Sequence, residues 1–278
     1  MKSFVRWCAA AILAFVPGAV FAAYNCSVSS PGFSAAYDPT APSTNITQTD
    51  FTITCTRALS DASTMSWTNS ANNGLYPRGG GRNRAAFGRS RISYDVYKDS
   101  ACGTQWRGGG SAFSGTLDFG GSTTASDTVS YWGCIPAGQG GLRAGTYSDS
   151  VTMTLNYGGF GSTNGIFPVT IFTPAQCSLT TAPGNVVFNY PGFGAAANAS
   201  TGFGVTCTNY LPYTMALDAT SGTLLGLNYT LALSAVSATG NGAEQSYVIS
   251  GNIAAGQAGT CASGLCSASQ GRVLTLTY

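Results

Sequence analysis

Cysteines are the residues of this chain best suited to chemistry. The 278 residues include nine cysteines and no histidine. Cys8 lies in an apolar N-terminal run, and eight others remain: Cys26, Cys55, Cys102, Cys134, Cys177, Cys207, Cys261 and Cys266. Zinc sites usually combine cysteine with histidine or use close cysteine pairs, and the sequence has no CxxC pair. The even set therefore predicts disulfide bonds formed in an oxidising compartment, and no metal site.

Spacing suggests how these cysteines pair. Four cysteines allow three pairings, and each half of the chain carries four. Similar spacings favour Cys26–Cys55 in the first half and Cys177–Cys207 in the second. The remaining pairs are then Cys102–Cys134 and Cys261–Cys266.

The sequence offers little for catalysis. Without histidine, neither a Ser-His-Asp nor a Cys-His arrangement can form. The acidic residues are scattered and suggest no carboxylate pair. The glycines around Arg82-Asn-Arg84 do not lead from a strand into a helix, as a phosphate-binding loop would. We therefore expect no enzyme activity and no cofactor.

The N-terminus has the pattern of an export signal. Lys2 and Arg6 precede an apolar run, and Val20-Phe-Ala22 supplies small residues for cleavage, so residues 1–22 are predicted to be a signal peptide. No later stretch is long and apolar enough to span a bilayer. Removing Lys2 and Arg6 from the twelve basic residues leaves ten, against ten acidic ones. This balance argues against nucleic acid or anionic lipid as a partner.

An internal repeat organises the rest of the chain. The first copy opens with Cys26-Ser-Val and reaches Phe51-Thr-Ile-Thr-Cys55-Thr, and the second opens with Cys177-Ser-Leu and reaches Phe203-Gly-Val-Thr-Cys207-Thr. Gly133-Cys-Ile-Pro-Ala-Gly-Gln139 is echoed by Gly251-Asn-Ile-Ala-Ala-Gly-Gln257. The copies close on Val151-Thr-Met-Thr-Leu-Asn-Tyr157 and Arg272-Val-Leu-Thr-Leu-Thr-Tyr278. Two domains of ordinary size follow from this repeat.

Alternation with period two predicts β-strands. Phe51, Ile53 and Cys55 share one face of such a segment, and threonines occupy the other. Similar short segments are separated by Gly- and Asn-rich turns, and none shows a sustained helical stripe. The predicted fold is all-β, with two tandem immunoglobulin-like antiparallel β-sandwiches.

The first copy continues into a further strand. Phe167, Val169 and Ile171 alternate within residues 166–172 and are expected to complete the first sandwich, with Pro168 placing this strand at a sheet edge. The alternative is that residues 158–176 form a linker. The predicted domains are residues 23–172 and 173–278. Nothing comparable follows Tyr278, so the second sandwich is expected to lack its final strand and to have an open edge.

Several of these motifs resemble the spore coat protein U domain family, the β-sandwich pilins of archaic chaperone–usher pili. The carrying segments are Gly145–Tyr157, Tyr94-Asp-Val-Tyr-Lys-Asp99 with Trp106, and Ile135-Pro-Ala-Gly-Gln139. The second copy matches at its two ends and at Ile253–Gln257, and Cys266-Ser-Ala-Ser-Gln-Gly271 replaces the Gly-Thr-Tyr-Ser-Asp turn. In such pilins a neighbour's N-terminal extension supplies the missing strand by β-augmentation.

The resemblance implies a place in the fibre and a set of partners. Only Ala23-Tyr-Asn25 precedes Cys26 after signal cleavage, which is too short to donate a strand. A subunit that accepts but cannot donate is expected at the pilus tip, as an adhesin for surface attachment and biofilm formation. Its expected partners are a periplasmic chaperone, an outer-membrane usher and a strand-donating pilin, and it is exported through the periplasm to the cell surface. The alternatives are a coat or minor fibre subunit without adhesive role, and a soluble carbohydrate-binding module.

Candidate sites follow from this interpretation. The donor-strand groove is expected between a first strand around Val186, Phe188 and Tyr190 and a last strand with Leu274, Leu276 and Tyr278, although Leu274 and Leu276 also suit an ordinary core. Adhesive loops are expected at the pole far from the second domain, at Leu59, at Phe113 in the Gly108–Phe113 region, and at Phe160 between two glycines. These would contact an abiotic or glycan surface. Each aromatic could equally pack on its own sandwich, as lone apolar residues at surfaces are common. Trp106 and Trp132 are interpreted as structural.

Arginines form a second candidate surface. Arg78, Arg82, Arg84, Arg89 and Arg91 hold half of the basic charge that remains after residue 22. They are interpreted first as a solvated Gly-rich loop, and second as a contact to an acidic polysaccharide or surface.

Overall fold

A computed structural model describes residues 24–39, 41–159, 161–262 and 264–278. The predicted signal peptide and Phe160 therefore lie outside the described residues. The described chain is built from β-strands, with one 3-10 turn, Gly109–Ser111. None of its helices is long and apolar enough to cross a membrane. The predicted all-β fold is confirmed.

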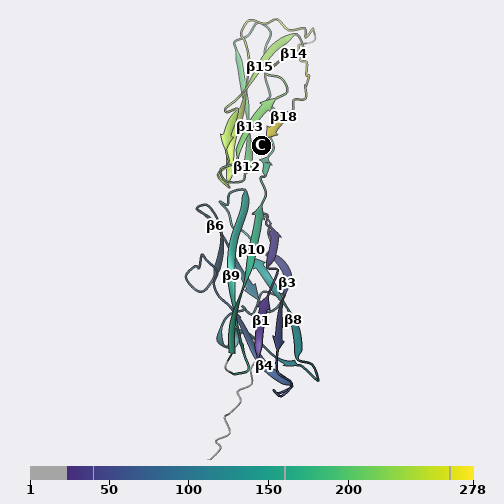
Figure 1. Ribbon diagram of the computed structural model, residues 1–278. Helices are drawn as coiled ribbons and strands as arrows, with labels where there is room; N and C mark the ends of the chain where they lie inside the picture. The colour runs from purple at the N-terminus through teal and green to yellow at the C-terminus, as the bar shows by residue number, and fades with distance from the viewer. Residues whose placement is uncertain (1–23, 40, 160, 263) are drawn as a thin grey trace, which may run out of the picture.

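The N-terminal half forms a complete sandwich (Figure 1). Its strands are β1 (Asn25–Ser29), β2 (Phe33–Ala36), β3 (Asn45–Thr56), β4 (Thr64–Ala71), β5 (Asn83–Phe87), β6 (Ser90–Tyr97), β7 (Phe113–Asp118), β8 (Thr124–Ile135), β9 (Gly145–Tyr157) and β10 (Gly161–Thr173). One layer has the order β1-β3-β8-β6 and the other β2-β10-β9-β4-β7, while β5 pairs with both β6 and β9. This order is immunoglobulin-like.

The C-terminal half repeats this plan with fewer strands. Its strands are β11 (Cys177–Thr181), β12 (Ala197–Cys207), β13 (Pro212–Leu217), β14 (Ser221–Leu224), β15 (Leu227–Leu233), β16 (Ser237–Thr239), β17 (Glu244–Ile253) and β18 (Leu274–Thr277). They form a sheet of order β11-β12-β17-β15-β14 and a three-stranded sheet of order β16-β13-β18. Each half has its own hydrophobic cluster, so the two sandwiches are built around separate cores.

The cores follow the alternation seen in the sequence. Phe51, Ile53 and Cys55 of β3 are fully buried, as are Ile92 and Val96 of β6. Burying such side chains contributes about 1.5–3 kcal/mol each relative to exposure. Trp106 is fully buried and stacks on Phe51 at a centroid distance of 5.0 Å, which agrees with its structural interpretation.

Four disulfide bonds brace the two halves. They are Cys26–Cys55, Cys102–Cys134, Cys177–Cys207 and Cys261–Cys266, which are the pairs favoured by the spacing. Cys26–Cys55 ties β1 to β3, and Cys177–Cys207 ties β11 to β12 in the same way. Among the described residues, no group of three or more potential metal ligands comes together.

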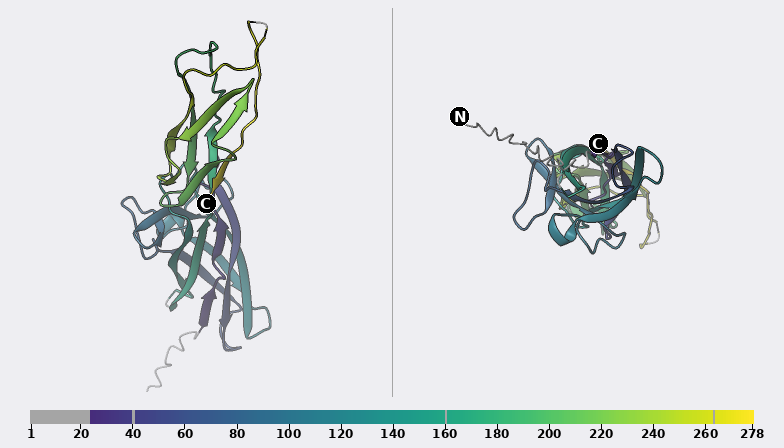
Figure 2. Two further views of the ribbon diagram at one scale, coloured as in Figure 1. Left: turned by 90° about the horizontal axis from the view of Figure 1, so that it is seen from above. Right: turned by 60° about the horizontal axis from the view of Figure 1, so that its bottom comes forward.

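The two sandwiches lie end to end (Figures 1 and 2). Between β10 and β11 only three residues intervene, and Thr208 N donates to Gln176 O at 2.8 Å within this linker region. Residues just before β9 contact the turn between β12 and β13. Asn209 Nδ2 donates a hydrogen bond to Gly141 O at 2.7 Å, and the Arg143 guanidinium lies 4.5 Å from the Tyr210 ring centroid. The C-terminus lies near this junction (Figure 1).

Candidate functional site

The first sandwich shows what a completed edge looks like. Strand β10 runs antiparallel to β9 along its whole length and pairs in parallel with β2 from Val169 to Phe172. Its inward side chains Phe167, Val169 and Ile171 are fully buried. Phe167 stacks on Trp106 at 5.9 Å and lies 5.4 Å from the Tyr131 ring. Residues 166–172 thus belong to a core strand and do not form a linker.

Pro168 does not place β10 at a sheet edge, contrary to the expectation. The outermost strand of this layer is β2, and β10 lies between β2 and β9. The pairing with β2 begins at Val169, directly after the proline. The missing N–H of Pro168 therefore removes no hydrogen bond from that ladder.

The register of the two halves identifies β18 as the counterpart of β9. In the first half Leu155 lies opposite Asn69 of β4, and in the second Leu276 lies opposite Met215 of β13. This agrees with the alignment of the closing motifs, in which Tyr157 corresponds to Tyr278. Strand β18 therefore occupies the place of β9, beside which β10 lies in the first half.

A repeated tyrosine–glutamine contact identifies residues 186–190 as the counterpart of β2. Tyr37, directly after β2, accepts a hydrogen bond from Gln139 N at 3.1 Å, and Tyr190 accepts one from Gln257 N at 2.9 Å. A Cβ on Gly251 would lie 2.4 Å from Phe188 Cζ, so a glycine is required there for this segment to pack on β17. The same close approach joins Gly133 to Phe33 of β2, at 2.7 Å.

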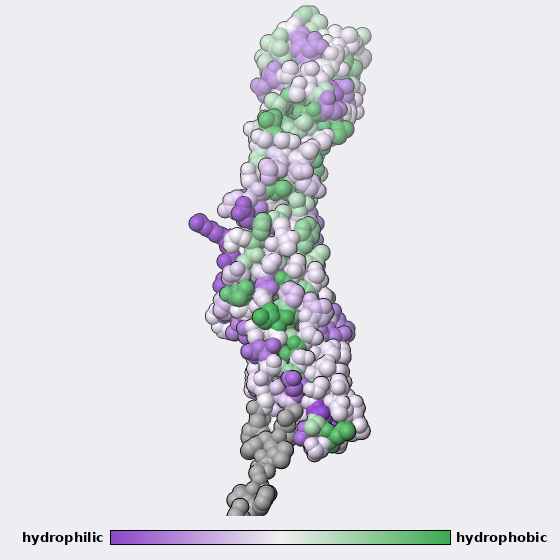
Figure 3. All heavy atoms as spheres, in the orientation of Figure 1, coloured by the Kyte–Doolittle hydropathy of each residue, from purple (hydrophilic) through white to green (hydrophobic). Residues whose placement is uncertain are grey.

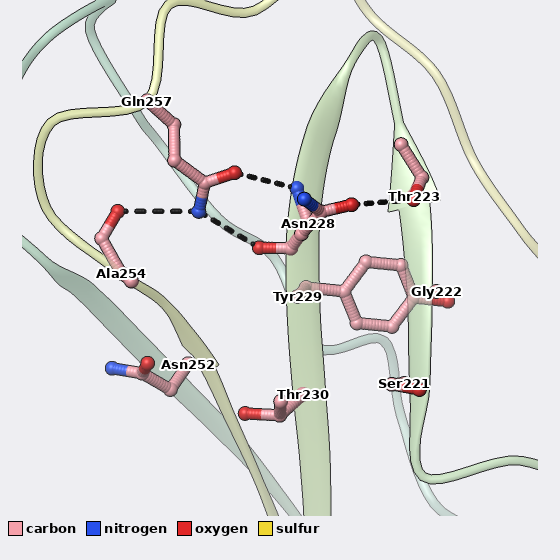
Figure 4. A pocket seen from close by; sticks show the side chains of 9 residues that line it. All are labelled: Ser221, Gly222, Thr223, Asn228, Tyr229, Thr230, Asn252, Ala254 and Gln257. Atoms are coloured by element: carbon pink, nitrogen blue, oxygen red, sulfur yellow. Dashed lines mark hydrogen bonds between the residues drawn. The ribbon is translucent and has the colours of Figure 1, made fainter.

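The same glutamines also clamp a neighbouring strand. The Gln139 side chain accepts from Ser93 N at 2.7 Å and donates to Ser93 O at 2.8 Å. Gln257 makes the matching pair with Asn228, at 2.7 and 3.0 Å (Figure 4). The echoed Ala-Gly-Gln of the sequence is thus a structural motif, whose role the sequence analysis left open.

A third repeated contact lies between the layers. Tyr94 of β6 donates to Asp149 Oδ2 of β9 at 2.6 Å, and Tyr229 of β15 donates to Gln270 Oε1 at 2.5 Å. Burial, with the Asp149 carboxylate as a second cause, raises the pKa of Tyr94. These correspondences place Gln270 at the position of Asp149, and Arg272 at that of Val151.

The strand that would correspond to β10 has no counterpart among the described residues of the second half. There, β18 pairs with β13 on one side, and its other edge has no ladder partner. Residues 186–190 form no strand pairing either, although they occupy the place of β2. The open edge, defined here as residues 186–190 and β18 with its approach from Gln270, is the candidate site.

Side chains along the open edge are less buried than their counterparts. Met153 and Leu155 of β9 are fully buried, whereas Leu274 and Leu276 of β18 are half-buried. Val186, Phe188 and Tyr190 are half-buried as well and pack against the second core, and Tyr278 is 59% exposed. Leu274 and Leu276 are therefore core residues that remain partly open to solvent.

One part of the expected groove needs correction. The first strand of the second half is β11, which ends at Thr181, so Val186 to Tyr190 are not part of it. Pro183 and Gly184 lie between the two segments, and neither residue favours a continuous central strand. The chain then crosses to the other layer, as it does between β1 and β2.

A hollow of about 560 Å³ lies on the same half, beside β14 and β15. Figure 4 shows its lining, which is dominated by hydroxyl and amide side chains with Tyr229 at its centre. Asn228 and Thr223 hydrogen-bond each other across it at 2.7 Å. The residues that line it carry no charged side chain.

The expected adhesive residues fall in different surroundings. Leu59 is 69% exposed in the β3–β4 loop, at the pole far from the second sandwich. Phe113 is not an exposed loop residue: its ring lies 5.3 Å from that of Phe51 and 5.4 Å from that of Trp106, beneath Lys98 Nζ. Phe160 lies outside the described residues.

The Gly108–Phe113 region is also not at the distal pole. Strand β7 reaches that pole at its other end, because Asp118 lies opposite Thr64 and Phe119 N donates to Ser63 O at 2.7 Å. Phe119, which was not among the predicted residues, lies at this pole: its ring stacks on that of Tyr24 at 5.9 Å, and the Arg57 guanidinium lies 5.3 Å from its centroid. Only the order of strands in space reveals this arrangement.

The arginine-rich segment is partly a hairpin and partly solvated turns, in which Arg78, Arg82 and Arg89 are exposed. Its Asn83–Phe87 portion forms β5, paired with β6. Arg84 donates to the carbonyl oxygens of Tyr76 and Pro77, and the Arg91 guanidinium lies 4.6 Å from the Tyr76 ring centroid. These two arginines therefore stabilise the hairpin in addition to carrying charge.

Taken together, the chain consists of two tandem immunoglobulin-like β-sandwiches, of which the second has an open edge. It belongs to a known family: the model described as Spore Coat Protein U domain matches residues 13–154. A comparison with curated protein sequences finds no match.

Two pilus proteins are among the solved structures to which this chain is similar. One is the chaperone–tip adhesion subunit pre-assembly complex of the archaic chaperone–usher Csu pili of Acinetobacter baumannii, with 14% identity, 91% of this chain and 100% of that chain covered, and a TM-score of 0.46. Another is the CupB6 tip adhesin of Pseudomonas aeruginosa, with 12% identity, coverage of 92% and 96%, and a TM-score of 0.43.

Proposed function

We propose that this chain is the tip adhesin of a chaperone–usher pilus and accepts a strand from another subunit at its second sandwich. The spore coat protein U family and the all-β fold support a pilus subunit and not an enzyme. The carrying observation is the difference between the two halves: where β10 fills the first sandwich, the second has an unpaired edge and half-buried leucines. Its domains are residues 23–172 and 173–278, with residues 1–22 removed on export.

The partners follow from the same edge. A strand inserted between residues 186–190 and β18 would pair its backbone on both sides and cover Leu274 and Leu276. Before assembly, a periplasmic chaperone would protect this edge, because an exposed edge beside apolar side chains promotes aggregation. An outer-membrane usher would then pass the subunit to the cell surface, where a strand-donating pilin holds it.

A strand attached in cis tests strand acceptance. A second copy of residues 158–172, appended after Tyr278 of the full-length chain, carries its own turn and should fold back along β18. At the roughly millimolar effective concentration that a short linker gives, we expect strong protection of the β18 amides and of residues 186–190 from hydrogen exchange. An effective concentration of 100 times the Kd of the strand would stabilise the second sandwich by about 2.7 kcal/mol.

Two matched variants of that fusion provide the control. Leu276→Asp puts a charge on the inward face of β18 and should abolish the gain in protection, whereas Thr275→Asp, on the outward face, should preserve it. If the appended strand leaves the exchange of β18 and residues 186–190 unchanged, the second sandwich does not accept a strand and the proposal is wrong.

The adhesive pole is tested separately. Leu59 is exposed at the pole that would lead the fibre, and the face in Figure 3 shows a small hydrophobic group at that pole. Leu59→Ser should lower attachment of the pilus-bearing cells to a hydrophobic surface severalfold without changing the amount of assembled pili. Leu75→Ser is the matched control, because Leu75 is 64% exposed but hydrogen-bonds through its backbone to Asp149, away from the pole. Equal attachment of the two variants would remove the adhesive role from this loop.

A further inference from the structure

Arg272 occupies a core position of the open edge. It corresponds to Val151, which is fully buried on β9. Its side chain alternates with exposed Val273 and is half-buried, so it points between the layers as Leu274 and Leu276 do. A charged residue at such a position is unusual, because burying a cation is costly unless a counter-charge accompanies it.

The completed sandwich shows which residue of an inserted strand would meet Arg272. In the first half Val151 lies directly opposite Phe167 of β10. Directly opposite residues on one face of an antiparallel pair have Cβ atoms about 4.5–5.5 Å apart. A strand inserted in this register would therefore place one inward side chain beside Arg272, at the position held by Phe167 in the first half.

The surroundings of that position differ between the halves. Phe167 packs among aromatic rings, including Trp106 and Tyr131. Around Arg272 the neighbours are polar: Nε and Nη2 donate to the Tyr229 hydroxyl at 3.0 and 2.6 Å, and Nη2 also donates to Ser221 O at 2.8 Å and to Gln270 Oε1 at 3.1 Å. A large apolar side chain at this place would therefore face a guanidinium and its polar partners beside the Tyr229 ring.

The guanidinium hydrogen-bonds to neutral acceptors, and its carboxylate partner in the described residues, Asp218, forms only a long ion pair with it. Asp218 Oδ2 lies 4.0 Å from Nη1, its Oδ1 accepts a hydrogen bond from Val273 N at 3.1 Å, and its side chain is 40% exposed. The Arg272 side chain is 18% exposed, so solvent still reaches it. An inserted strand would remove that solvent, and the neutral acceptors together with one long, partly exposed ion pair offset only part of the lost hydration of the charge.

Building on the proposed strand acceptance, we infer that the open edge selects a donor strand with a carboxylate side chain, aspartate or glutamate, opposite Arg272. The carboxylate reaches Nη1 and neutralises the cation as the edge closes. The positions opposite Leu274 and Leu276 take small or apolar residues, as Gly165 and Thr163 do opposite Met153 and Leu155. Arg272 thus acts as a specificity-determining residue, which favours a strand with a carboxylate over one that is apolar at this position but still allows the latter to bind.

Three synthetic peptides test this selection on the full-length chain. Each has the sequence of residues 161–173, with Phe, Asp or Asn at the Phe167 position, and their Kd values are measured by calorimetry. Because charge-assisted hydrogen bonds contribute about 1.5–3 kcal/mol, the Asp peptide should bind at least about tenfold more tightly than the Phe and Asn peptides. Its advantage should shrink as salt is raised.

The matched variant is Arg272→Val, which installs the residue of the first half. In this variant the order should reverse, with the Phe peptide preferred over the Asp peptide. If the peptides bind but the Asp peptide has no advantage, or if Arg272→Val keeps the same order, the inference is overturned while strand acceptance stands. If none of the peptides binds and the appended strand also gives no protection, strand acceptance itself fails.

Discussion

Phe167→Ala should destabilise the first sandwich by about 3–5 kcal/mol, the range measured for removal of a buried phenylalanine. The ring is fully buried and stacks on Trp106, so the truncation opens a cavity between two layers that otherwise close tightly. Denaturation followed by tryptophan fluorescence isolates this half, because Trp67, Trp106 and Trp132 all lie in it and no tryptophan follows residue 132.

Ile166→Ala is the matched control. Ile166 precedes Phe167 on the same strand but is 65% exposed, so its truncation should cost no more than about 0.5 kcal/mol. If the two variants unfold at the same denaturant concentration, residues 166–172 do not contribute a core strand. Adding the peptide of residues 161–173 should restore little of the stability that Phe167→Ala loses, because the β10 strand of the variant still occupies its place beside β9.

Alkaline pH should unfold the first sandwich. Burial raises the pKa of Tyr94, assisted by the Asp149 carboxylate, and burial also raises the pKa of Tyr131. In the unfolded chain both phenols ionise near pH 10, so their contribution to folding is complete below that pH and is lost as pH rises above it. Above about pH 10, each of the two phenols should lower the free energy of unfolding by about 1.4 kcal/mol per pH unit.

Single and double phenylalanine variants check the origin of this loss. Tyr94→Phe and Tyr131→Phe should each flatten the slope of unfolding free energy against pH above about pH 10 by one such contribution. Tyr94→Phe should also lower stability at neutral pH, because the Asp149 carboxylate loses the hydrogen bond that it accepts from the Tyr94 hydroxyl. An unchanged slope in the double variant would mean that other groups govern alkaline unfolding.

The strand pattern was readable from sequence because alternation depends on local residue order. Phe51, Ile53 and Cys55 were expected on one face and are buried together. The internal repeat also pointed to the unequal ends of the two halves. What local order could not give was the place of each strand within a layer: Pro168 suggested an edge, whereas β2 reaches the strand after the proline and covers it.

Loop residues were harder to predict, because their surroundings are assembled from distant parts of the chain. Phe113 follows three glycines and suggested an exposed tip, but the ring turns onto Phe51 and Trp106. The role of Gln257 depends equally on a strand far away in sequence, through Asn228. In the sequence, the sign of this role was the repeated Ala-Gly-Gln, which indicates that both halves need the glutamine but does not indicate which residue it contacts.

The continuity of β10 with the second sandwich has a mechanical consequence. A pull along the molecule's long axis passes from the second sandwich into β10 through three residues, and β10 is paired with β9 over its full length. Ladder hydrogen bonds lie across the strand direction, so this load shears them all at once and cannot peel them one after another. Under the function proposed above, flow acting on an attached cell would load the β9–β10 ladder in shear.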